Sequence, residues 1–337
     1  MPQEPPPLSL MKMLCGKWLT QAIGVAAELR LADHLAAGPR SAAELAAATG
    51  ANEDGVFRLL RGLASVGVFA EGEPRKFALT PMAACLQSDV PGSLAAVARF
   101  FAHEVTWRPW GEALHSVRTG EQAFSKVFGK PVFEWAPEHP EATQVFHEAM
   151  TSISTMDSMA VAAGYDFSGI DTLVDIGGGH GLLLATVLEQ HPRMKGILFD
   201  QPHATEGAKQ LLASRGLTGR CEVVAGDFFA QVPSGGDAYM MKHILHDWDD
   251  ALSTKILESC HQAMGPAAKL LVVDAVIAPG NDPDFGKLLD LEMLVMTTGG
   301  RERTQADFAA LFDRAGFRLT RVVPTMAPAS VVEGVRA

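Results

Sequence analysis

The sequence predicts an α/β protein, with a mainly helical N-terminal domain followed by a doubly wound parallel sheet. Three observations support this fold class: strands alternate with helices in the second half, a glycine cluster follows the first of these strands, and the first half contains a helix–turn–helix–hairpin pattern. We place the domain boundary near residue 165. The expected parts are a disordered lead-in at residues 1–7, a helical domain at residues 8–165 and a sheet domain at residues 166–337.

Composition limits the classes of function. Of the 337 residues, 47% are hydrophobic and 20% are charged, as expected of a globular protein with a sizeable core. The net charge of −11 argues against a general attraction to nucleic acid or to an anionic membrane. The four cysteines are far apart, which favours free thiols in a reducing compartment. No apolar run approaches the ~20 residues that span a bilayer, and the start does not read as a signal peptide, so we expect a cytoplasmic protein.

The first half reads as a winged helix. Apolar residues recur at helical spacing over residues 8–35. Ser41 and Glu44 form a capping-box pattern that opens a short helix, and Asn52 can cap a second helix. A short hairpin between residues 67 and 79 completes the order. From about residue 94 to residue 163 the chain is again helical and rich in aromatic residues and methionine.

The second half alternates strands with helices. We predict strands at residues 173–176, 196–200, 221–225, 238–242, 269–274, 317–323 and 330–334. We predict helices at residues 182–190, 204–215, 251–264, 286–296 and 305–315. This alternation is typical of a parallel sheet covered by helices.

A glycine-rich loop follows the first strand of the predicted sheet. Residues 177–181 read G-x-G-x-G, which differs from the G-x-G-x-x-G of dinucleotide binders. Asp200 ends the second strand, where a carboxylate can accept hydrogen bonds from ribose hydroxyls. Asp227 follows the third strand and can bond an adenine amino group, while Phe228 can cover the ring. These features indicate a nucleotide-like ligand; the alternative is a tight turn with two helix-capping acids.

A polar segment follows the fourth strand. Residues 241–250 contain two histidines, one lysine and three aspartates. In sheets of this kind ligands bind at the carboxyl ends of the strands. A histidine with a pKa near 6.5 can accept a proton at neutral pH, whereas Asp249 or Asp250 fits the cap of the next helix.

Together these blocks resemble the plant-type caffeate and flavonoid O-methyltransferases and their bacterial relatives in antibiotic biosynthesis. The resemblance covers nearly the whole chain and lies in the blocks LVDIGGGHG (173–181), FDQPH (199–203), GDFF (226–229), KHILHDW (242–248) and GGRERT (299–304). It implies a Rossmann-like catalytic domain that binds S-adenosylmethionine and releases S-adenosylhomocysteine. It also implies that the N-terminal domain forms an intertwined homodimer.

The resemblance assigns roles to individual positions. His246, in the H-D-W triplet, is the expected general base. Two carboxylates are expected beside it: Asp274, where the plant enzymes usually have Glu, and Glu302. The expected cofactor contacts are Gly177, Gly179, Asp200, Asp227, Phe228, Lys242 and Ser154. The expected substrate-facing residues are Phe146, Met150, Met293 and Thr297.

The acceptor is expected to be a small phenol. A phenol has a pKa near 10, so a histidine base is mismatched by only about 3–4 units. A sugar or alkyl hydroxyl is far less acidic. The acceptor itself is not identified by the sequence, and methylation at nitrogen or at a carboxyl group stays open.

Three other functions are alternatives to an O-methyltransferase. A metal-assisted enzyme would need more ligands than His243, His246 and the adjoining Asp247 offer, so we expect no metal ion. A DNA-binding regulator is suggested by the winged helix but disfavoured by the acidic chain. A relative that keeps the fold without methylating is disfavoured by the presence of His246 and Glu302.

Overall fold

The computed structural model describes residues 5–337, apart from the side chains of residues 133 and 203. The chain divides into two compact units. The first comprises the residues up to Gly111 together with Phe133–Ile153, and the second comprises Glu112–Val132 together with Ser154–Ala337. The second unit thus contains a helical segment that the boundary near residue 165 assigned to the first. In that segment the Gln122 amide donates a hydrogen bond of 2.6 Å to the hydroxyl of Thr298.

The first unit contains mainly helices. They are α1 (Pro6–Leu14), α2 (Gly16–Glu28), α3 (Leu31–His34), α4 (Ala42–Thr49), α5 (Glu53–Ala64), α6 (Pro81–Ala84), α7 (Ala95–Ala102) and α8 (Glu104–Gly111). Because α1 begins at Pro6, the predicted disordered lead-in does not extend to residue 7. Proline is compatible with the first turn of a helix, where its missing N–H is not needed. Residues 1–4 of that lead-in lie outside the described part of the chain.

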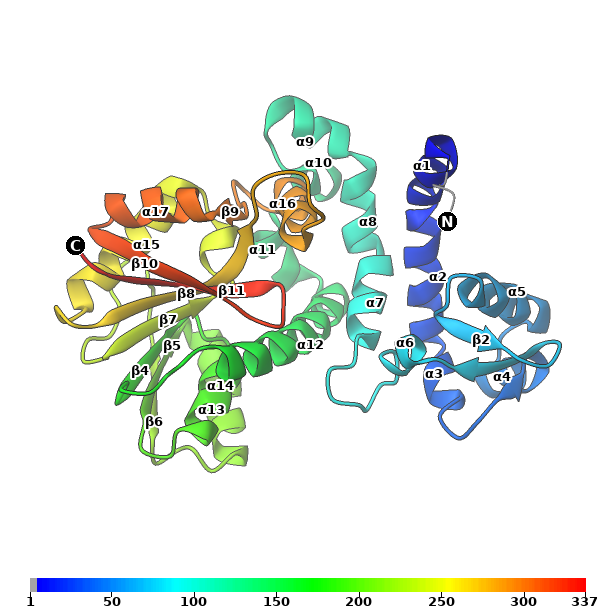
Figure 1. The fold of residues 1–337 in the computed structure, drawn as a ribbon, viewed down its shortest axis with the longest axis horizontal. Coiled ribbons are helices and arrows are strands. Elements are labelled where there is room, and N and C mark those ends of the chain that lie inside the picture. The colour runs from blue at the N-terminus through cyan, green and yellow to red at the C-terminus, as the bar shows by residue number, and fades with distance from the viewer. Residues whose placement is uncertain (1–4) are drawn as a thin grey trace. The chain divides into compact units, whose positions relative to one another are not determined.

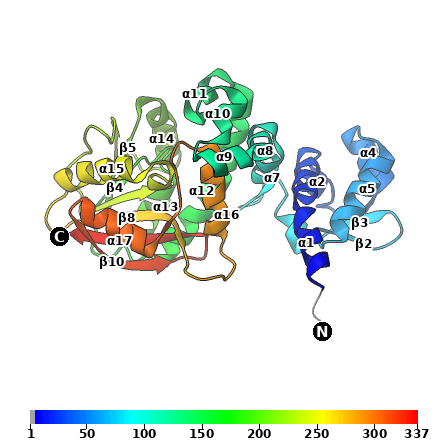
Figure 2. The same ribbon diagram turned by 90° about the horizontal axis from the view of Figure 1, so that it is seen from above.

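The predicted helix–turn–helix–hairpin order is present in this unit. The Ser41–Glu44 capping box begins α4, and the Asn52 side chain accepts a hydrogen bond from the Gly55 N–H at the start of α5. Helix α5 buries Val56 and other apolar residues of one face. Strands β1 (Arg40–Ser41), β3 (Lys76–Leu79) and β2 (Phe69–Glu71) pair antiparallel in that order, and α4 and α5 lie side by side near this hairpin (Figures 1 and 2). This arrangement confirms the winged helix.

The segment between residues 112 and 164 is also helical. It contains α9 (Ala113–Thr119), α10 (Ala123–Phe128), α11 (Val132–Trp135), the 3₁₀ helix η1 (Ala136–Glu138) and α12 (Pro140–Gly164). Helix α12 belongs to the first unit up to Ile153 and to the second from Ser154 on. Within residues 5–337 no helix is long and apolar enough to cross a membrane.

The second unit contains the large sheet. Its strands are β4 (Thr172–Ile176), β5 (Lys195–Asp200), β6 (Cys221–Ala225), β7 (Ala238–Lys242), β8 (Lys269–Ile277), β9 (Arg303–Thr304), β10 (Phe317–Pro324) and β11 (Ala329–Arg336). Its other helices are α13 (Leu182–Gln190), α14 (Pro202–Ser214), the 3₁₀ helix η2 (Leu245–Asp247), α15 (Asp250–Ala263), α16 (Phe285–Met296) and α17 (Gln305–Arg314).

The sheet is mixed, whereas the sequence predicted a parallel one. The strand order is β10-β11-β8-β7-β4-β5-β6, and the strands from β8 to β6 pair in parallel. β11 pairs antiparallel with both β8 and β10. The cause is the connection between β10 and β11, which is only residues 325–328. A parallel pair needs a crossover of a dozen or more residues, so these two strands form a hairpin.

Helices cover both faces of this sheet (Figure 1). Successive strand residues point to opposite faces. Accordingly, Leu173 packs in a cluster with residues of α12, α13 and α14, while Val174 packs in a second cluster with residues of α15 and α17. Both residues are fully buried. The sheet is therefore fixed from both sides, and its carboxyl edge carries the loops that follow β4, β5, β6 and β7.

Candidate active site

The glycine loop after β4 has a conformation that favours glycine. Gly177, Gly179 and Gly181 have φ angles of 66°, 56° and 82°, in the left-handed region that side chains disfavour. A Cβ atom at Gly177 would also collide with the side chain of Ile244. The loop is held by a hydrogen bond of 2.8 Å from the Gly177 N–H to the Phe199 carbonyl. The result is a surface of bare backbone that a ligand can approach closely.

Asp200 lies beside this loop at the end of β5. Its two carboxylate oxygens accept hydrogen bonds from the backbone N–H groups of Gly179, at 2.7 Å, and Gln201, at 2.6 Å. Each carboxylate oxygen has a second lone pair, so the oriented carboxylate can still accept hydroxyl donors. Beyond β6, Asp227 is exposed and Phe228 is half-buried against Phe229. These residues fit a ligand with a ribose and a purine.

A buried charge network lies below the loop. Asp175, in β4, is 2% exposed, and burial raises its pKa to about 7; nearby Lys242 acts against that shift and Asp200 adds to it. Burial also lowers the pKa of Lys242, which the carboxylates of Asp157, Asp175 and Asp274 oppose. Lys242 thus provides a positive charge among carboxylates at the end of β7.

His246 and Glu302 form the central pair of the site. Nδ1 of His246 lies 2.8 Å from Oε1 of Glu302, and the Glu302 side chain has no exposed surface. His246 belongs to η2, directly after the β7 edge, and its side chain is 13% exposed. Nε2 lies 3.7 Å from Oδ1 of Asp247, beyond hydrogen-bond distance. Because Glu302 fixes Nδ1, Nε2 is the ring nitrogen that is available to a reacting group.

The carboxylates around His246 change its acidity. Burial alone would lower the pKa of the imidazole, but Asp247, Glu302 and Asp274 outweigh burial and raise the pKa to about 10. The pKa of Asp247 is itself raised, chiefly by burial. His246 therefore binds its proton more tightly than a free imidazole does.

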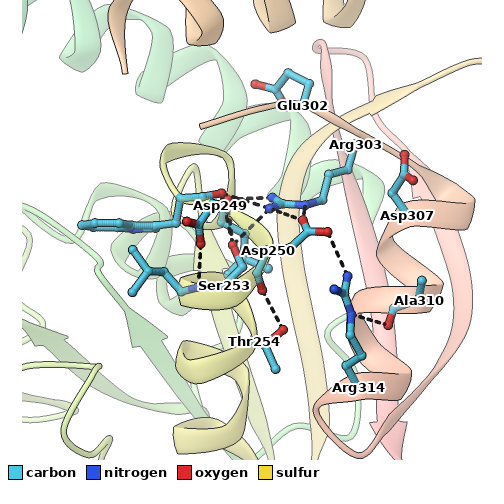
Figure 3. Close-up of polar contacts among 12 residues, drawn as sticks. Asp249, Asp250, Ser253, Thr254, Glu302, Arg303, Asp307, Ala310 and Arg314 are labelled. Carbon is cyan, nitrogen blue, oxygen red and sulfur yellow. Dashed lines mark hydrogen bonds and ion pairs between the residues drawn. The ribbon is translucent and has the colours of Figure 1, made fainter. Parts of the chain in front are cut away.

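Arg303 fastens the loop that carries His246 (Figure 3). Its guanidinium, 1% exposed, donates to the carbonyls of Leu245 at 2.7 Å and Trp248 at 3.0 Å. It also donates to Asp250 at 2.9 Å and to the hydroxyl of Ser253. These contacts flank His246 on both sides in the sequence. The position of the imidazole relative to Glu302 therefore depends on Arg303, the next residue in the chain.

The segment from the end of α16 to Glu302 is tied to the same loop. The Glu302 N–H donates to Asp290 of α16 at 2.9 Å, and the Arg301 N–H donates to the His246 carbonyl at 2.8 Å. A Cβ atom at Gly300 would collide with the His246 carbonyl at 2.6 Å. This close backbone approach gives a structural reason for glycine at position 300.

Asp274 lies near His246, but among the described residues no hydrogen bond joins the two side chains. It was expected to flank His246 from the end of a strand, yet β8 continues to Ile277 and Asp274 lies inside it, 1% exposed. Its Oδ1 lies 3.5 Å from Nδ1 of His243, and no hydrogen bond to it is found among the described residues. Its influence on His246 is Coulombic. The carboxylate of Asp274 thus lies beside His243.

His243 is more closely involved in the site than the sequence suggested. Its φ of 54° is unusual for a residue with a side chain. Nε2 is hydrogen-bonded to Asp157 of α12 at 2.8 Å, and the ring stacks on that of His246 with centroids 5.0 Å apart. The backbone strain is a sign of a functional position.

The predicted substrate residues fall into both units. Met293 and Thr297 lie at the end of α16, where the Thr297 hydroxyl donates to the Met293 carbonyl at 2.8 Å, and both are buried. Phe146 and Met150 lie on the part of α12 that belongs to the first unit, where Phe146 packs edge-on against Phe100. Ser154, a predicted cofactor contact, is half-buried in the second unit.

The site defines a class of protein. A glycine loop without a phosphate-binding pattern, an oriented acid at the end of the next strand and a histidine–carboxylate pair at the same sheet edge are the parts of an S-adenosylmethionine-dependent methyltransferase. The chain belongs to the O-methyltransferase family: the model of the O-methyltransferase domain matches residues 107–318, and that of the O-methyltransferase dimerisation domain matches residues 11–89. The resemblance inferred from the motifs is thereby confirmed.

Individual relatives match almost the whole chain. A phenazine O-methyltransferase of Lysobacter antibioticus is 46% identical, over 97% of this chain and 96% of its own. The calicheamicin-biosynthesis methyltransferase CalO1, solved in its S-adenosylhomocysteine-bound form, is 37% identical with a TM-score of 0.90, over 98% of both chains. An 8-amino-8-demethylriboflavin N,N-dimethyltransferase of Streptomyces davaonensis is 39% identical, over 91% of this chain and 89% of its own. The chain uses S-adenosylmethionine, and its family serves natural-product biosynthesis.

Sequence reasoning missed five residues that the structure brings into the site. Asp175 and Arg303 stand inside motifs that were noticed, and a buried acid in an apolar strand is a visible signal. The sequence analysis considered His243 and Asp247 only as an insufficient set of metal ligands. Asp157, far away in the sequence on α12, offers no local signal for its bond to His243.

Replacing Arg303 with methionine is expected to lower the free energy of unfolding by about 2–3 kcal/mol, because two buried carbonyls and Asp250 lose a charged donor. Arg314→Met is the matched control: Arg314 binds the same Asp250 carboxylate from the exposed side, so its loss should cost under about 1 kcal/mol. Urea unfolding measures both. Equal small losses would show that Arg303 does not hold the loop.

Glu302→Gln is expected to lower the pKa of His246, because the variant loses one of the negative charges that stabilise the imidazolium. Because the pKa of His246 is raised from 6.5 to about 10, the protonated imidazole stabilises the folded state. This contribution is complete below about pH 6.5 and is lost as the pH rises through 10. In the variant the loss should occur at lower pH. NMR titration of the ¹⁵N-labelled imidazoles measures the shift, with His261, whose pKa is lowered by burial, as the internal reference. An unchanged His246 titration would contradict this electrostatic account.

Proposed function

We propose that this protein methylates a phenolic hydroxyl of a small aromatic natural product, with His246 as the general base and without a metal ion. The observation that carries the proposal is the His246–Glu302 hydrogen bond at the carboxyl edge of the sheet. It fixes one ring nitrogen and leaves Nε2 to accept a proton. The arrangement is the one by which a carboxylate orients a catalytic histidine in hydrolase triads.

Other residues of the second unit are candidates for binding the cofactor. S-adenosylmethionine supplies an electrophilic methyl group on a positively charged sulfonium. The loop of Gly177 and Gly179 offers bare backbone, Asp200 accepts hydroxyl donors, and Asp227 with Phe228 suits the adenine. Lys242 is placed below the loop, and Ser154 on α12 is a further candidate contact. Most of the rate gain is expected from positioning the acceptor.

The basicity of His246 supports a phenolic acceptor. A phenol has a pKa near 10, and the pKa of His246 is raised to about 10, so the proton passes between nearly matched partners. This match is closer than an unperturbed histidine provides. Only the neutral imidazole accepts the proton, so kcat/KM should rise with pH below that value. The phenazine O-methyltransferase relative, by its name, also modifies an aromatic molecule.

In the second unit Met293 and Thr297 are our candidate acceptor contacts, and Phe146 and Met150 stay candidate contacts within the first unit. Met293 and Thr297 lie where α16 ends, and the segment that follows leads to Glu302. Apolar methionine and phenyl side chains suit a flat aromatic acceptor. Glu302 and Asp247 provide negative charge to the imidazolium after it has taken the proton.

His246→Gln is expected to lower kcat by roughly 10²–10⁴ while S-adenosylhomocysteine binding is unchanged, because the variant removes the base and no part of the glycine loop. The assays are methyl transfer to a panel of phenols, followed by mass spectrometry, and calorimetry with S-adenosylhomocysteine. His261→Asn, which removes an imidazole packed on Phe317, should keep full turnover. Near-wild-type turnover of His246→Gln would remove His246 from the mechanism. Products methylated at nitrogen would show that the acceptor is not a phenolic hydroxyl.

We also propose a homodimer formed through the first unit. Its α1 and α2 expose large apolar side chains, with Met13 at 76% and Trp18 at 65%, within the region matched by the dimerisation domain. Exposed apolar patches of this kind mark interaction sites. Met13→Asp combined with Trp18→Asp should give a monomer in light scattering, whereas Met326→Asp, an exposed change elsewhere, should leave the dimer intact. A double variant that stays dimeric would place the interface elsewhere.

A further inference from the structure

We propose that His243, His246 and Asp274 form a binding site for a zinc-type cation, and that the ion inhibits methyl transfer by occupying His246. One ligand atom of each residue lies within 4.8 Å of the others. Nδ1 of His243 and Oδ1 of Asp274 are 3.5 Å apart. Two ligands of a tetrahedral ion with bonds of 2.0–2.1 Å are about 3.3 Å apart, so His243 and Asp274 need only a small shift, whereas His246 must move closer by up to about 1.5 Å.

Each imidazole gives one ring nitrogen to a carboxylate, as metal-binding histidines do. His243 uses Nε2 for its hydrogen bond to Asp157, and His246 uses Nδ1 for its bond to Glu302, each at 2.8 Å. Metal-binding histidines typically give their second nitrogen to a carboxylate in this way, which fixes the tautomer and raises the basicity of the ligating nitrogen. In the neutral rings the remaining nitrogens, Nδ1 of His243 and Nε2 of His246, carry the lone pairs, and at His246 the ion takes the place of a proton.

Asp274 provides an independent observation. Its side chain is 1% exposed, and neither carboxylate oxygen has a hydrogen-bond donor among the described residues. Nδ1 of His243 is buried without a hydrogen-bond partner as well. A carboxylate facing an imidazole lone pair is a pair of acceptors that lacks a donor, and leaving such groups buried is costly. A cation between them satisfies both.

The surrounding charges favour a cation. The carboxylates of Asp157, Asp247, Asp274 and Glu302 face the two histidines, and Lys242 is the cation that acts on Asp157 and Asp274. With both imidazoles neutral, four negative charges face one positive charge. A divalent ion offsets most of this excess. The carboxylates that raise the pKa of His246 would thus stabilise a metal ion in place of that proton.

The ligand set selects the kind of ion. Two imidazole nitrogens and one carboxylate oxygen suit Zn²⁺ or Co²⁺, whereas Mg²⁺ and Ca²⁺ prefer all-oxygen sites. Three protein ligands leave a fourth position for water. An ion bound to Nε2 of His246 blocks the nitrogen that would accept the proton. Binding itself does not depend on the proposed function, but inhibition does.

Titration of the full-length, EDTA-treated protein with Co²⁺ tests the site directly. We expect a saturable visible absorption of tetrahedral Co²⁺ at one ion per chain, which added Zn²⁺ abolishes. His243→Asn and Asp274→Asn should lose the spectrum. Asp157→Asn, which removes only the orienting carboxylate, should weaken Co²⁺ binding by about 10–100-fold. His261→Asn, an imidazole change at the opposite edge of the sheet, should retain the wild-type spectrum.

Circular dichroism is used to check that each variant is folded. If Asp274→Asn does not fold, Asp157→Asn still tests the site. Absence of the spectrum in the wild type, or its persistence in folded His243→Asn, overturns the site. In the activity assay, Zn²⁺ should inhibit reversibly and EDTA should restore turnover. If Co²⁺ binds as predicted but Zn²⁺ leaves turnover unchanged, the inhibitory role falls together with His246 as the base, while the metal site stands.

Discussion

The hydrogen bond between His246 and Glu302 is the interaction on which the rest of the site depends. It joins two loops that are 56 residues apart in the chain, and it decides which imidazole nitrogen is free. Its geometry rests on Arg303, whose buried guanidinium holds the backbone on both sides of His246. The residue that accepts the proton and the residue that orients it are therefore positioned by one structural unit, composed of η2, β9 and the ends of α15 and α16.

The parallel strands bring the other components to the same edge. The glycine loop and Asp227 follow β4 and β6, and Asp200 and Lys242 end β5 and β7. The carboxyl ends of these four strands coincide because the strands pair in parallel. This convergence concentrates acidic side chains around two imidazoles. The same negative field gives His246 its raised pKa and makes the cluster with His243 and Asp274 suitable for a cation.

Most of the fold followed from local signals. The capping residues Ser41 and Asn52 and the period of the sheet strands act over a few residues, and these elements lie where they were predicted. The antiparallel direction of β11 depends on its short connection to β10, and the alternation of strands and helices did not predict it. Within the site, Glu302 was found through its motif. The pairing of Asp274 with His243 depends on how far β8 extends, and that of Asp157 depends on the packing of α12.

A crystal structure with S-adenosylhomocysteine and a phenolic acceptor would test the central claim most directly. The account predicts the acceptor hydroxyl within about 3 Å of Nε2 of His246. Nδ1 should remain bonded to Glu302. An acceptor oxygen that lies against a different base, or an imidazole that has turned Nε2 away from it, would contradict the account.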